Sequence, residues 1–314
     1  MSVTVLMPVY NAGPYLHQAI ASILQQSYQD FELLIVNDAS TDRSGDIIQE
    51  YAKADLRITF ISHDRNMGLA ATLNEGLSLA RYDLVARMDQ DDEALPSRLA
   101  VQLDYMQSHP EVFVAGSFVY HMAASQSSDR LVQLPITYEQ IRATLPRENC
   151  IYHPSVIMRR QKILDLGGYR AQFKNAEDYD LWLRVSKNYP LVNIPQPLLR
   201  YRFSVGGMTL SRKWEQLFYV CLAQVAHQHE SATLEEIQEQ AREKHHQINK
   251  LDFLRTVAKG TVDELVSLQL WQEARQIATN FAPDIGSIFA YKLKLYIAVT
   301  YLRRYLSQDL SAKK

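Results

Sequence analysis

The sequence predicts an α/β fold in which a mixed, mainly parallel sheet carries flanking helices and an all-helical C-terminal region follows. Two observations support this prediction. Short apolar runs rich in β-branched residues alternate with helical patterns through the first hundred residues, as expected of repeated βα units. Beyond Trp214 the strand patterns stop and only helical patterns remain. We therefore expect two parts, residues 1–210 and residues 211–314.

Four buried strands and three helices are expected in the first hundred residues. Each strand is a short apolar run, which is typical of a parallel strand covered on both faces. Between the strands, apolar residues recur at helical spacing. The expected strands are residues 3–7, 31–36, 57–61 and 83–88, and the expected helices lie within residues 15–28, 47–51 and 69–80.

The pattern loosens after residue 95 and becomes helical again towards the C-terminus. The run Thr233-Leu-Glu-Glu236 has the form of a capping box that opens a polar helix. The middle region fits a sheet completed by mixed strands and loops. There we expect helices over residues 96–108 and 176–187, a strand over residues 113–117 and a polar loop over residues 121–135.

Composition and charge exclude several classes of protein. Hydrophobic residues form 47% and charged residues 22% of the chain, which is the profile of a folded soluble protein. The formal net charge of −2 provides no global positive field for a nucleic acid, so we expect no nucleic-acid partner. The N-terminus lacks a basic segment and its apolar run stops at Pro8, unlike a signal peptide. Cys150 and Cys221 have no zinc-site spacing and are expected to be buried thiols of a cytoplasmic protein.

Polar residues follow three of the expected strands at the point where each strand ends. Tyr10 and Asn11 follow the first strand, Asn37 and Asp38 follow the second, and residues 89–92 follow the fourth. In open α/β sheets the ligand binds beyond the carboxyl ends of the strands. These side chains are therefore expected to line one cleft.

Asp89 and Asp91 form a candidate metal site. If the chain stays extended after the fourth strand, side chains two residues apart point the same way. Two carboxylates on one face repel each other, and a hard divalent cation, Mg²⁺ or Mn²⁺, removes that repulsion. Such a cation would neutralise the charge on a departing nucleoside diphosphate.

A structural explanation of the same acidic residues is also open. Asp92 or Glu93 could cap the helix that follows Pro96, and Asp38 could belong to a turn that leads into a helix N-terminus. A cap at residue 92 or 93 does not account for Asp89 and Asp91 together, so the metal site is favoured.

Several segments, in the expected order over residues 3–210, resemble family 2 glycosyltransferases with the GT-A fold. The last of them, Ala176-Glu-Asp-Tyr-Asp-Leu-Trp182, contains the acidic pair of such enzymes. The others are residues 3–12 (VTVLMPVYNA), 35–42 (IVNDASTD), 66–70 (NMGLA) with Asn74, 86–92 (ARMDQDD), 153–159 (HPSVIMR) and 167–169 (GGY).

The resemblance implies a nucleotide-sugar donor, roles for the residues that would bind it, and a Mn²⁺ or Mg²⁺ cofactor. Asp38 would hydrogen-bond the uracil of a UDP-sugar, Asp91 would be the principal metal ligand, and Asp89 would contact the ribose or the metal. The remaining nucleotide-binding residues would be Pro8, Tyr10, Asn11 and Asn66.

The resemblance also places the general base at Asp178, with Glu177 as the second choice. The base would deprotonate an acceptor hydroxyl during a single displacement that inverts the anomeric carbon. From the residues alone, both carboxylates could instead complement the dipole of a helix capped by Asn175.

Two departures from the family pattern bear on this assignment. Many relatives carry a metal-binding histidine after a late Tyr-Arg pair, whereas Tyr201-Arg-Phe-Ser204 puts Ser204 there and leaves the third protein ligand open. The Gln/Arg-x-x-Arg-Trp motif and spanning helices of processive synthases are missing, which indicates a single-transfer enzyme.

The C-terminal segment, residues 285–306, mixes basic residues with aliphatic and aromatic ones. A basic amphipathic helix can lie in a membrane interface, which would suit a lipid-linked acceptor in surface polysaccharide synthesis and a peripheral position at the inner face of the membrane. The same apolar side chains could pack on their own domain or form a homodimer.

Two other functions are compatible with an α/β fold of this layout. A non-catalytic nucleotide- or glycan-binding module would have no chemical need for Asp38, Asp89, Asp91 and Asp178 together. A sugar-1-phosphate nucleotidyltransferase needs a Gly-rich loop with a basic residue, but residues 10–14 offer one glycine and no Lys or Arg. A glycosyltransferase acting on a glycan or lipid-linked acceptor is therefore expected.

Overall fold

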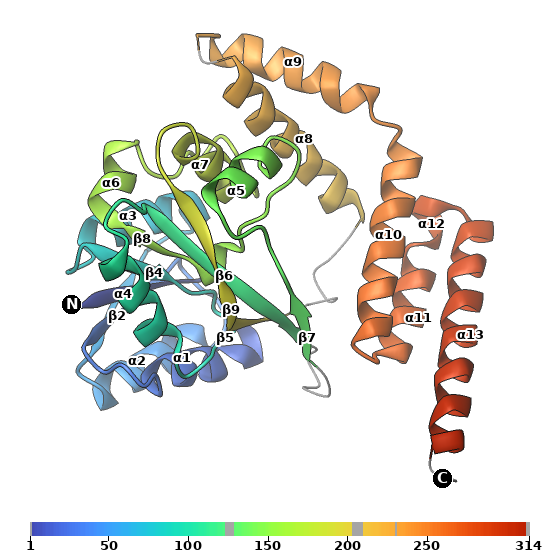
Figure 1. Ribbon diagram of the computed structural model, residues 1–314, viewed down its shortest axis with the longest axis horizontal. Coiled ribbons are helices and arrows are strands. Elements are labelled where there is room, and N and C mark those ends of the chain that lie inside the picture. The colour runs from blue at the N-terminus through green and yellow to red at the C-terminus, as the bar shows by residue number, and fades with distance from the viewer. Residues whose placement is uncertain (1, 123–128, 203–209, 230, 312–314) are drawn as a thin grey trace. The chain divides into compact units, whose positions relative to one another are not determined.

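The computed structural model describes residues 2–122, 129–202, 210–229 and 231–311 (Figure 1). It divides into two compact units, a sheet unit and a helical unit. The sheet unit comprises residues 1–121, 131–202 and 223–232, and the helical unit comprises residues 122–130, 203–222 and 233–314. The boundary expected near residue 210 stays a prediction.

The sheet unit is built on a nine-stranded mixed sheet. The strand order is β3-β2-β1-β4-β8-β6-β9-β5, and β7 pairs with β6. The first four strands in this order are parallel, whereas β8 runs antiparallel to both β4 and β6. The strands are β1 (Val3–Val9), β2 (Phe31–Asn37), β3 (Ile58–Ser62), β4 (Leu84–Arg87), β5 (Glu93–Ala94), β6 (Val114–Met122), β7 (Asp129–Val132), β8 (Ile157–Arg159) and β9 (Leu191–Arg202).

Helices cover both faces of the parallel strands, with α1 and α2 on one side and α3 and α6 on the other (Figure 1). All seven residues of β1 and of β2 are buried, which confirms the continuous apolar runs as central strands. The close packing of α3 on β1 requires Gly76, because a Cβ there would lie 2.3 Å from Leu6 Cδ1. The helices of this unit are α1 (Leu16–Leu24), α2 (Ser44–Ala54), α3 (Leu69–Leu79), α4 (Arg98–Ser108), α5 (Tyr138–Thr144), α6 (Arg160–Asp165) and α7 (Glu177–Val185).

The polar loop expected over residues 121–135 is wrong in part. Strand β6 continues to Met122, and Asp129–Val132 forms β7 beside it. The side chains of β7 are exposed or half-buried. A short exposed strand of this kind has no apolar alternation, so its sequence resembles a loop.

Within its described residues the C-terminal region contains only helices and the short turns that join them, as predicted. The capping box is present, since Thr233 Oγ1 accepts from the Glu236 amide at 3.3 Å and Glu236 Oε2 accepts from the Thr233 amide at 2.7 Å. No helix in the described part of the chain is long and apolar enough to cross a membrane. The helices are α8 (Leu210–Gln228), α9 (Leu234–Gln247), α10 (Lys250–Ser267), α11 (Trp271–Asn280), α12 (Ala282–Ile285) and α13 (Ser287–Ser311).

Candidate active site

A cavity of about 620 Å³ lies at the carboxyl ends of β1, β2 and β4, where the polar strand ends were expected to meet. Six of the predicted nucleotide and metal residues line it, and Asn11 is not among the lining residues. The six are Pro8, Tyr10, Asp38, Asn66, Asp89 and Asp91. We call this space the donor cavity.

Asn11 joins the two loops that follow β1 and β2. Its side-chain oxygen accepts from the Thr41 amide at 2.8 Å, and its own amide donates to Ser40 Oγ at 3.0 Å. Its φ of +49° lies in the left-handed region, which asparagine tolerates better than most residues. In this structure Asn11 therefore shapes the turn below the cavity.

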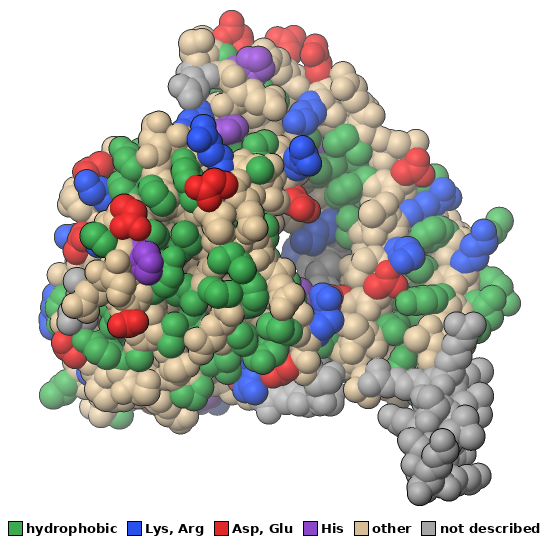
Figure 2. Space-filling model, viewed as in Figure 1, with side chains coloured by type: hydrophobic (Ala, Val, Ile, Leu, Met, Phe, Trp, Pro, Cys, Tyr) green, Lys and Arg blue, Asp and Glu red, His purple; other side chains and the backbone are tan. Residues whose placement is uncertain are grey.

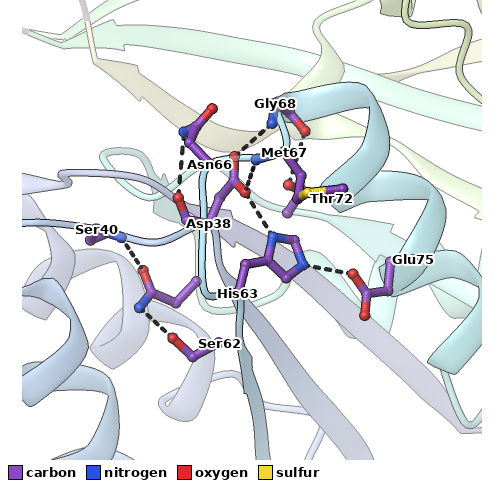
Figure 3. A network of polar contacts seen from close by, with 10 residues as sticks. Asp38, Ser40, Ser62, His63, Asn66, Met67, Gly68, Thr72 and Glu75 are labelled. Atoms are coloured by element: carbon purple, nitrogen blue, oxygen red, sulfur yellow. Dashed lines mark hydrogen bonds and ion pairs between the residues drawn. The ribbon is translucent and has the colours of Figure 1, made fainter.

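Asp38 is a buried carboxylate that the protein holds from three sides (Figure 3). Its Oδ1 accepts from the Met67 amide at 2.7 Å and faces His63 Nδ1 at 2.7 Å, and its Oδ2 accepts from the Gly68 amide at 2.9 Å. Burial alone would raise the pKa of Asp38. The hydrogen bonds from Met67, His63 and Gly68 outweigh burial and lower the pKa below its usual value.

His63 lies between two carboxylates, and no sequence pattern had indicated it. Its Nδ1 faces Asp38, and its Nε2 faces Glu75 Oε2 at 2.6 Å (Figure 3). An ionised carboxylate only accepts hydrogen bonds, so both ring nitrogens must donate and the ring is an imidazolium. Burial lowers the pKa of His63, but the bonds to Asp38 and Glu75 outweigh it and raise the pKa.

Asp89, Asp91 and Asp92 form an acidic cluster at the other end of the donor cavity. Each offers an oxygen, and the three oxygens lie within 4.8 Å of one another. The chain does not stay extended after β4 but turns at Gln90 and Asp91. Asp89 and Asp91 lie close together as expected, but because of this turn and not because of an extended chain. The turn also places Asp92 beside them.

The cluster suits a hard divalent cation. Burial and the charge of Asp89 raise the pKa of Asp91 to about 6. Burial and the charges of Asp89 and Asp91 raise the pKa of Asp92 well above its usual value. Within the described residues, the buried Asp92 Oδ2 has no hydrogen-bond partner. The three carboxylates repel one another, and one of their buried oxygens accepts no hydrogen bond. Carboxylate oxygens of this kind are the ligands that Mg²⁺ and Mn²⁺ prefer.

The alternative that Asp92 or Glu93 caps the next helix is wrong. Helix α4 begins after Ser97, and no side chain caps it. Asp92 Oδ1 instead accepts from the Arg202 amide at 2.7 Å, and Glu93 pairs with the Arg202 guanidinium at 3.2 Å. Both acidic side chains thus bind the end of β9. Ser204, considered for the third metal-ligand position, lies outside the described residues.

Arg202 ties β9 to the acidic cluster, a role that the sequence had not indicated. Its Nε donates to the Asp91 carbonyl oxygen at 2.7 Å, and its guanidinium lies over the Tyr15 ring at 4.1 Å. The side chain is buried. Arg202 therefore fixes the backbone of the turn from which the Asp91 carboxylate projects.

A second cavity, of about 310 Å³, adjoins the donor cavity and shares Asp89 and Tyr201 with it. It is lined by Glu177 and Asp178, the two candidates for the general base. We call this space the acceptor cavity. The candidate base and the candidate metal ligands thus come from distant parts of the sequence and border neighbouring spaces.

The two candidate bases differ in their surroundings. Asp178 Oδ2 accepts from Asn149 Nδ2 at 2.9 Å, and burial raises the pKa of Asp178. Burial and the neighbouring Asp178 raise the pKa of Glu177 to about 7. The cap expected at Asn175 is wrong, because Ala176 occupies the N-cap without a side-chain bond. Asn175 instead has a left-handed φ of +59° and lines the donor cavity.

Arg87, at the end of β4, is a buried cation beside both groups of carboxylates. It forms an ion pair with Asp89 and lines the acceptor cavity. Its positive charge lowers the pKa of Asp91, Glu177 and Asp178, against the larger effect of burial. The sequence had shown Arg87 only as part of a motif.

Asn74 and Gly168 hold the loop that leads to the candidate base. Asn74 Nδ2 donates to the Tyr169 carbonyl at 2.8 Å, and the Tyr169 amide donates to Asn74 Oδ1 at 2.8 Å. Gly168 has a φ of +62°, and a Cβ there would lie 2.4 Å from Asn74 Oδ1. These two motif residues therefore support the site without lining either cavity.

Comparison with known sequences agrees with this geometry. The family model for glycosyl transferase family 2 matches residues 4–167. The amylovoran biosynthesis glycosyltransferase AmsE of Erwinia amylovora is 31% identical over 217 residues, which cover 68% of this chain and 81% of that protein. The O-antigen biosynthesis glycosyltransferase WbnJ of Escherichia coli is 32% identical over 204 residues, which cover 64% and 79% of the two chains.

Solved structures share the fold at low sequence identity. The mannosyltransferase PcManGT of Pyrobaculum calidifontis, solved with GDP-Man and Mn²⁺, has a TM-score of 0.59 and 18% identity, with 96% of this chain and 86% of that chain covered. Residues 1–349 of S. aureus TarS, solved with UDP-GlcNAc, give a TM-score of 0.57 and 16% identity, with 97% and 92% covered. The GT-A-type fold is thereby confirmed, and the chain belongs to glycosyl transferase family 2 and is a glycosyltransferase.

Proposed function

We propose that this enzyme transfers a sugar from a nucleotide-sugar donor, preferably a UDP-sugar, to a hydroxyl of a glycan or lipid-linked acceptor. Transfer requires Mn²⁺ or Mg²⁺ and inverts the anomeric carbon. The observation that carries the proposal is the pair of adjoining cavities, one with the acidic cluster and the other with Asp178. The named roles of AmsE and WbnJ support an acceptor in surface polysaccharide synthesis.

The hydrogen bonds of Asp38 favour uracil over guanine. A carboxylate has about four acceptor positions, two on each oxygen. Oδ1 uses both of its positions on Met67 and His63, whereas Oδ2 uses one on Gly68. One position is left for a ligand in the cavity that Asp38 lines. Uracil presents a single N–H donor on its pairing edge, whereas guanine presents two adjacent donors, so the free position suits a uracil.

The acidic cluster would hold the metal ion through Asp91 and Asp89, with Asp92 as a further oxygen donor. A bound divalent cation neutralises the charge that develops on the leaving nucleoside diphosphate. The protein contributes the orientation of these carboxylates. Arg202 holds the backbone of Asp91, and Arg87 pairs with Asp89.

Asp178 is the better of the two candidate bases. During transfer the acceptor oxygen forms a bond to the anomeric carbon while the bond to the diphosphate breaks, and the base takes the hydroxyl proton. The Asn149 amide donates to Asp178 and so favours its charged form. Glu177, with a pKa of about 7, is partly protonated near neutral pH and serves as the second choice.

Thermal shift with nucleotides tests the proposal directly. UDP, GDP, TDP and CTP would each be added with and without Mn²⁺. We expect the largest stabilisation from UDP with Mn²⁺, because a ligand that binds only the folded state raises its stability. Asp91→Ala should remove the manganese-dependent part of the UDP effect. Stronger stabilisation by CTP than by UDP would contradict the transferase and point to a nucleotidyltransferase.

A non-catalytic binding module would give the same thermal shifts, so turnover decides between the two. Release of UDP from UDP-sugars would be followed with and without added glycan acceptors. Donor hydrolysis or transfer that requires Mn²⁺ supports the enzyme. Donor binding without any turnover across UDP-sugars and acceptors would favour the binding module.

A further inference from the structure

Helix α13 packs its inner face on its own bundle. Ala290, Leu293 and Ile297 recur at helical spacing and are at most 5% exposed. They belong to a core of buried residues that α10, α11 and α12 also supply. The inner face therefore accounts for the folding of this helix within the helical unit.

The outer face of α13 is also apolar, although the bundle does not cover it. Ile288 is 77% exposed and Leu295 is 53% exposed. Hydrophobic and Lys or Arg side chains lie next to one another on the part of the bundle turned to the viewer in Figure 2. Four exposed large hydrophobic residues of this helix, which we call the α13 outer face, are Ile288, Tyr291, Leu295 and Val299. Tyr301 is also exposed but packs on Trp271 of α11, and Tyr296 lies beside Asp263 of α10.

Ile288, Tyr291, Leu295 and Val299 are spaced by three or four residues and so form one row along the helix. Scattered exposed apolar residues are common, but a continuous row of them marks an interaction surface. The row lies opposite the buried positions 290, 293 and 297. The row is therefore accessible to a binding partner.

The charges that residues 285–308 themselves contribute are of one sign, although Asp263 of α10, which is paired with Lys259, lies beside Tyr296. Residues 285–308 contain four Lys or Arg and no Asp or Glu. Among them, Lys292 is exposed and Lys294 is half-buried. Such a segment attracts an anionic surface, and the attraction falls with salt.

Helix α9 provides an internal comparison. It carries both Glu and Lys or Arg residues and buries only Ala241, as a solvated helix does. The α13 outer face has neither the acidic residues nor the polarity of α9. Solvation alone is therefore a poor explanation of its composition.

An anionic lipid surface fits this face better than a second copy of the chain. Pairing two α13 outer faces would bring like charges together, which opposes association. A lipid interface accepts aliphatic side chains below the headgroups and tyrosine rings at their level. The lysine head groups can then reach the anionic phosphates.

We infer that the α13 outer face binds anionic membranes, with its apolar row inserted into the interface and Lys292 at the lipid phosphates. The helix lies along the membrane surface. This mode of attachment would bring the enzyme to a lipid-linked acceptor without a spanning segment.

Vesicle co-sedimentation of the full-length protein tests this inference. Vesicles of phosphatidylcholine alone would be compared with vesicles of equal parts phosphatidylcholine and phosphatidylglycerol, at low and high salt. We expect binding to the anionic vesicles that high salt reduces. The double variant Ile288→Ser/Leu295→Ser should lower the partition coefficient by about tenfold or more, and Lys292→Glu should lower binding to anionic vesicles only.

Leu56→Ser is the matched control, because Leu56 is fully exposed in the sheet unit. This variant should bind vesicles like the original protein. The replaced α13 residues are exposed, so circular dichroism melting should match the original for every variant. If the double variant has a lower melting temperature than the original protein, Lys292→Glu still tests the inference, because it changes only the charge of an exposed side chain.

Absence of binding to anionic vesicles at low salt would overturn the inference. Equal binding by the original protein, the double variant and Lys292→Glu would overturn it as well. Light scattering that shows a dimer split by Ile288→Ser/Leu295→Ser would assign the face to a second copy instead. Vesicle binding is measured without donor or acceptor, so its failure would leave the proposed transfer reaction untouched.

Discussion

Two carboxylates that line the donor cavity, Asp38 and Asp91, have pKa values that the protein shifts in opposite directions. Asp38 follows β2 and is compensated by two backbone amides and the His63 ring, which lower its pKa. Asp91 follows β4, and burial together with the like charge of Asp89 raises its pKa to about 6. Both residues line the same cavity.

The difference separates two uses of an acidic side chain. A carboxylate whose charge is already compensated by hydrogen bonds within the protein is a rigid acceptor and can select among the nucleobases of a donor. A carboxylate left among like charges is costly in the folded protein and is relieved when a cation binds. The predictions below test this contrast in order of decreasing effect.

Replacement of the candidate base should have the largest effect on turnover. Asp178→Asn removes the proton acceptor, so we expect kcat to fall by about 10²–10⁴-fold. The affinity for UDP should be unchanged, because Asp178 lines the acceptor cavity and not the donor cavity. Steady-state kinetics and nucleotide titration would measure both values.

Glu177→Gln is the comparison for this variant, with an expected smaller loss. Normal turnover in Asp178→Asn would exclude Asp178 as the base. A large loss in Glu177→Gln alone would transfer the role to its neighbour.

Asp91→Asn should separate activity from stability. We expect turnover to fall by about 10²–10³-fold, since a bound cation contributes several kcal/mol to stabilisation of the transition state. The metal-free variant should be more stable to urea than the original protein, because one repelling charge is gone. Activity assays with Mn²⁺ and urea unfolding in EDTA would measure the two effects. Lower stability of the metal-free variant would contradict the proposed repulsion.

Asp38→Asn should change stability in the opposite direction. The amide group cannot replace the charged acceptor of Met67, Gly68 and His63, so we expect a loss of about 1.5–3 kcal/mol in the free energy of unfolding. Urea unfolding would measure it. Asp64→Asn, at an exposed position beside His63, is the control and should change stability by less than about 0.5 kcal/mol. Equal effects of the two substitutions would remove the contrast between Asp38 and Asp91.

The pH dependence of stability should reveal the His63 imidazolium, with the smallest of these effects. Its pKa is raised in the folded protein, so its contribution is complete below the unfolded value of about 6.5. It is lost as the pH rises through the higher folded pKa. Unfolding by urea across this window should show the loss in the original protein but not in His63→Gln. An identical pH profile for the two proteins would show that His63 is not charged.

Local sequence patterns were sufficient to predict the main strands and helices of the first hundred residues and the helical C-terminal region. The apolar runs at residues 3–7 and 31–36 identified central strands because both faces of a parallel sheet are buried. The capping box at Thr233 was visible because its partners are three residues apart. The exposed strand β7 was missed because its four residues, two charged and then two apolar, show no alternation of polar and apolar side chains.

The candidate site was predicted less completely. The strand-end rule indicated that Asp38, Asp89 and Asp91 share a cavity, and the family motifs indicated Asp178. Three supporting residues gave no local signal. His63 and Arg202 act through partners that lie far away in the sequence, and Arg87 pairs with nearby Asp89 but reaches Glu177 and Asp178 only through the fold.

The sequence by itself determined the alternating strands and helices of the first hundred residues, the helical character of the C-terminal region, the family, and the acidic residues that follow the strands. These properties depend on residue type and short spacing. The tertiary structure alone decided which carboxylates are compensated. Asp38 is held by residues that follow β3, whereas Asp92 is held on one oxygen by the amide of Arg202 at the end of β9. Such contacts depend on how distant strands pair. That pairing distinguishes a carboxylate suited to binding a nucleobase from one suited to binding a metal ion.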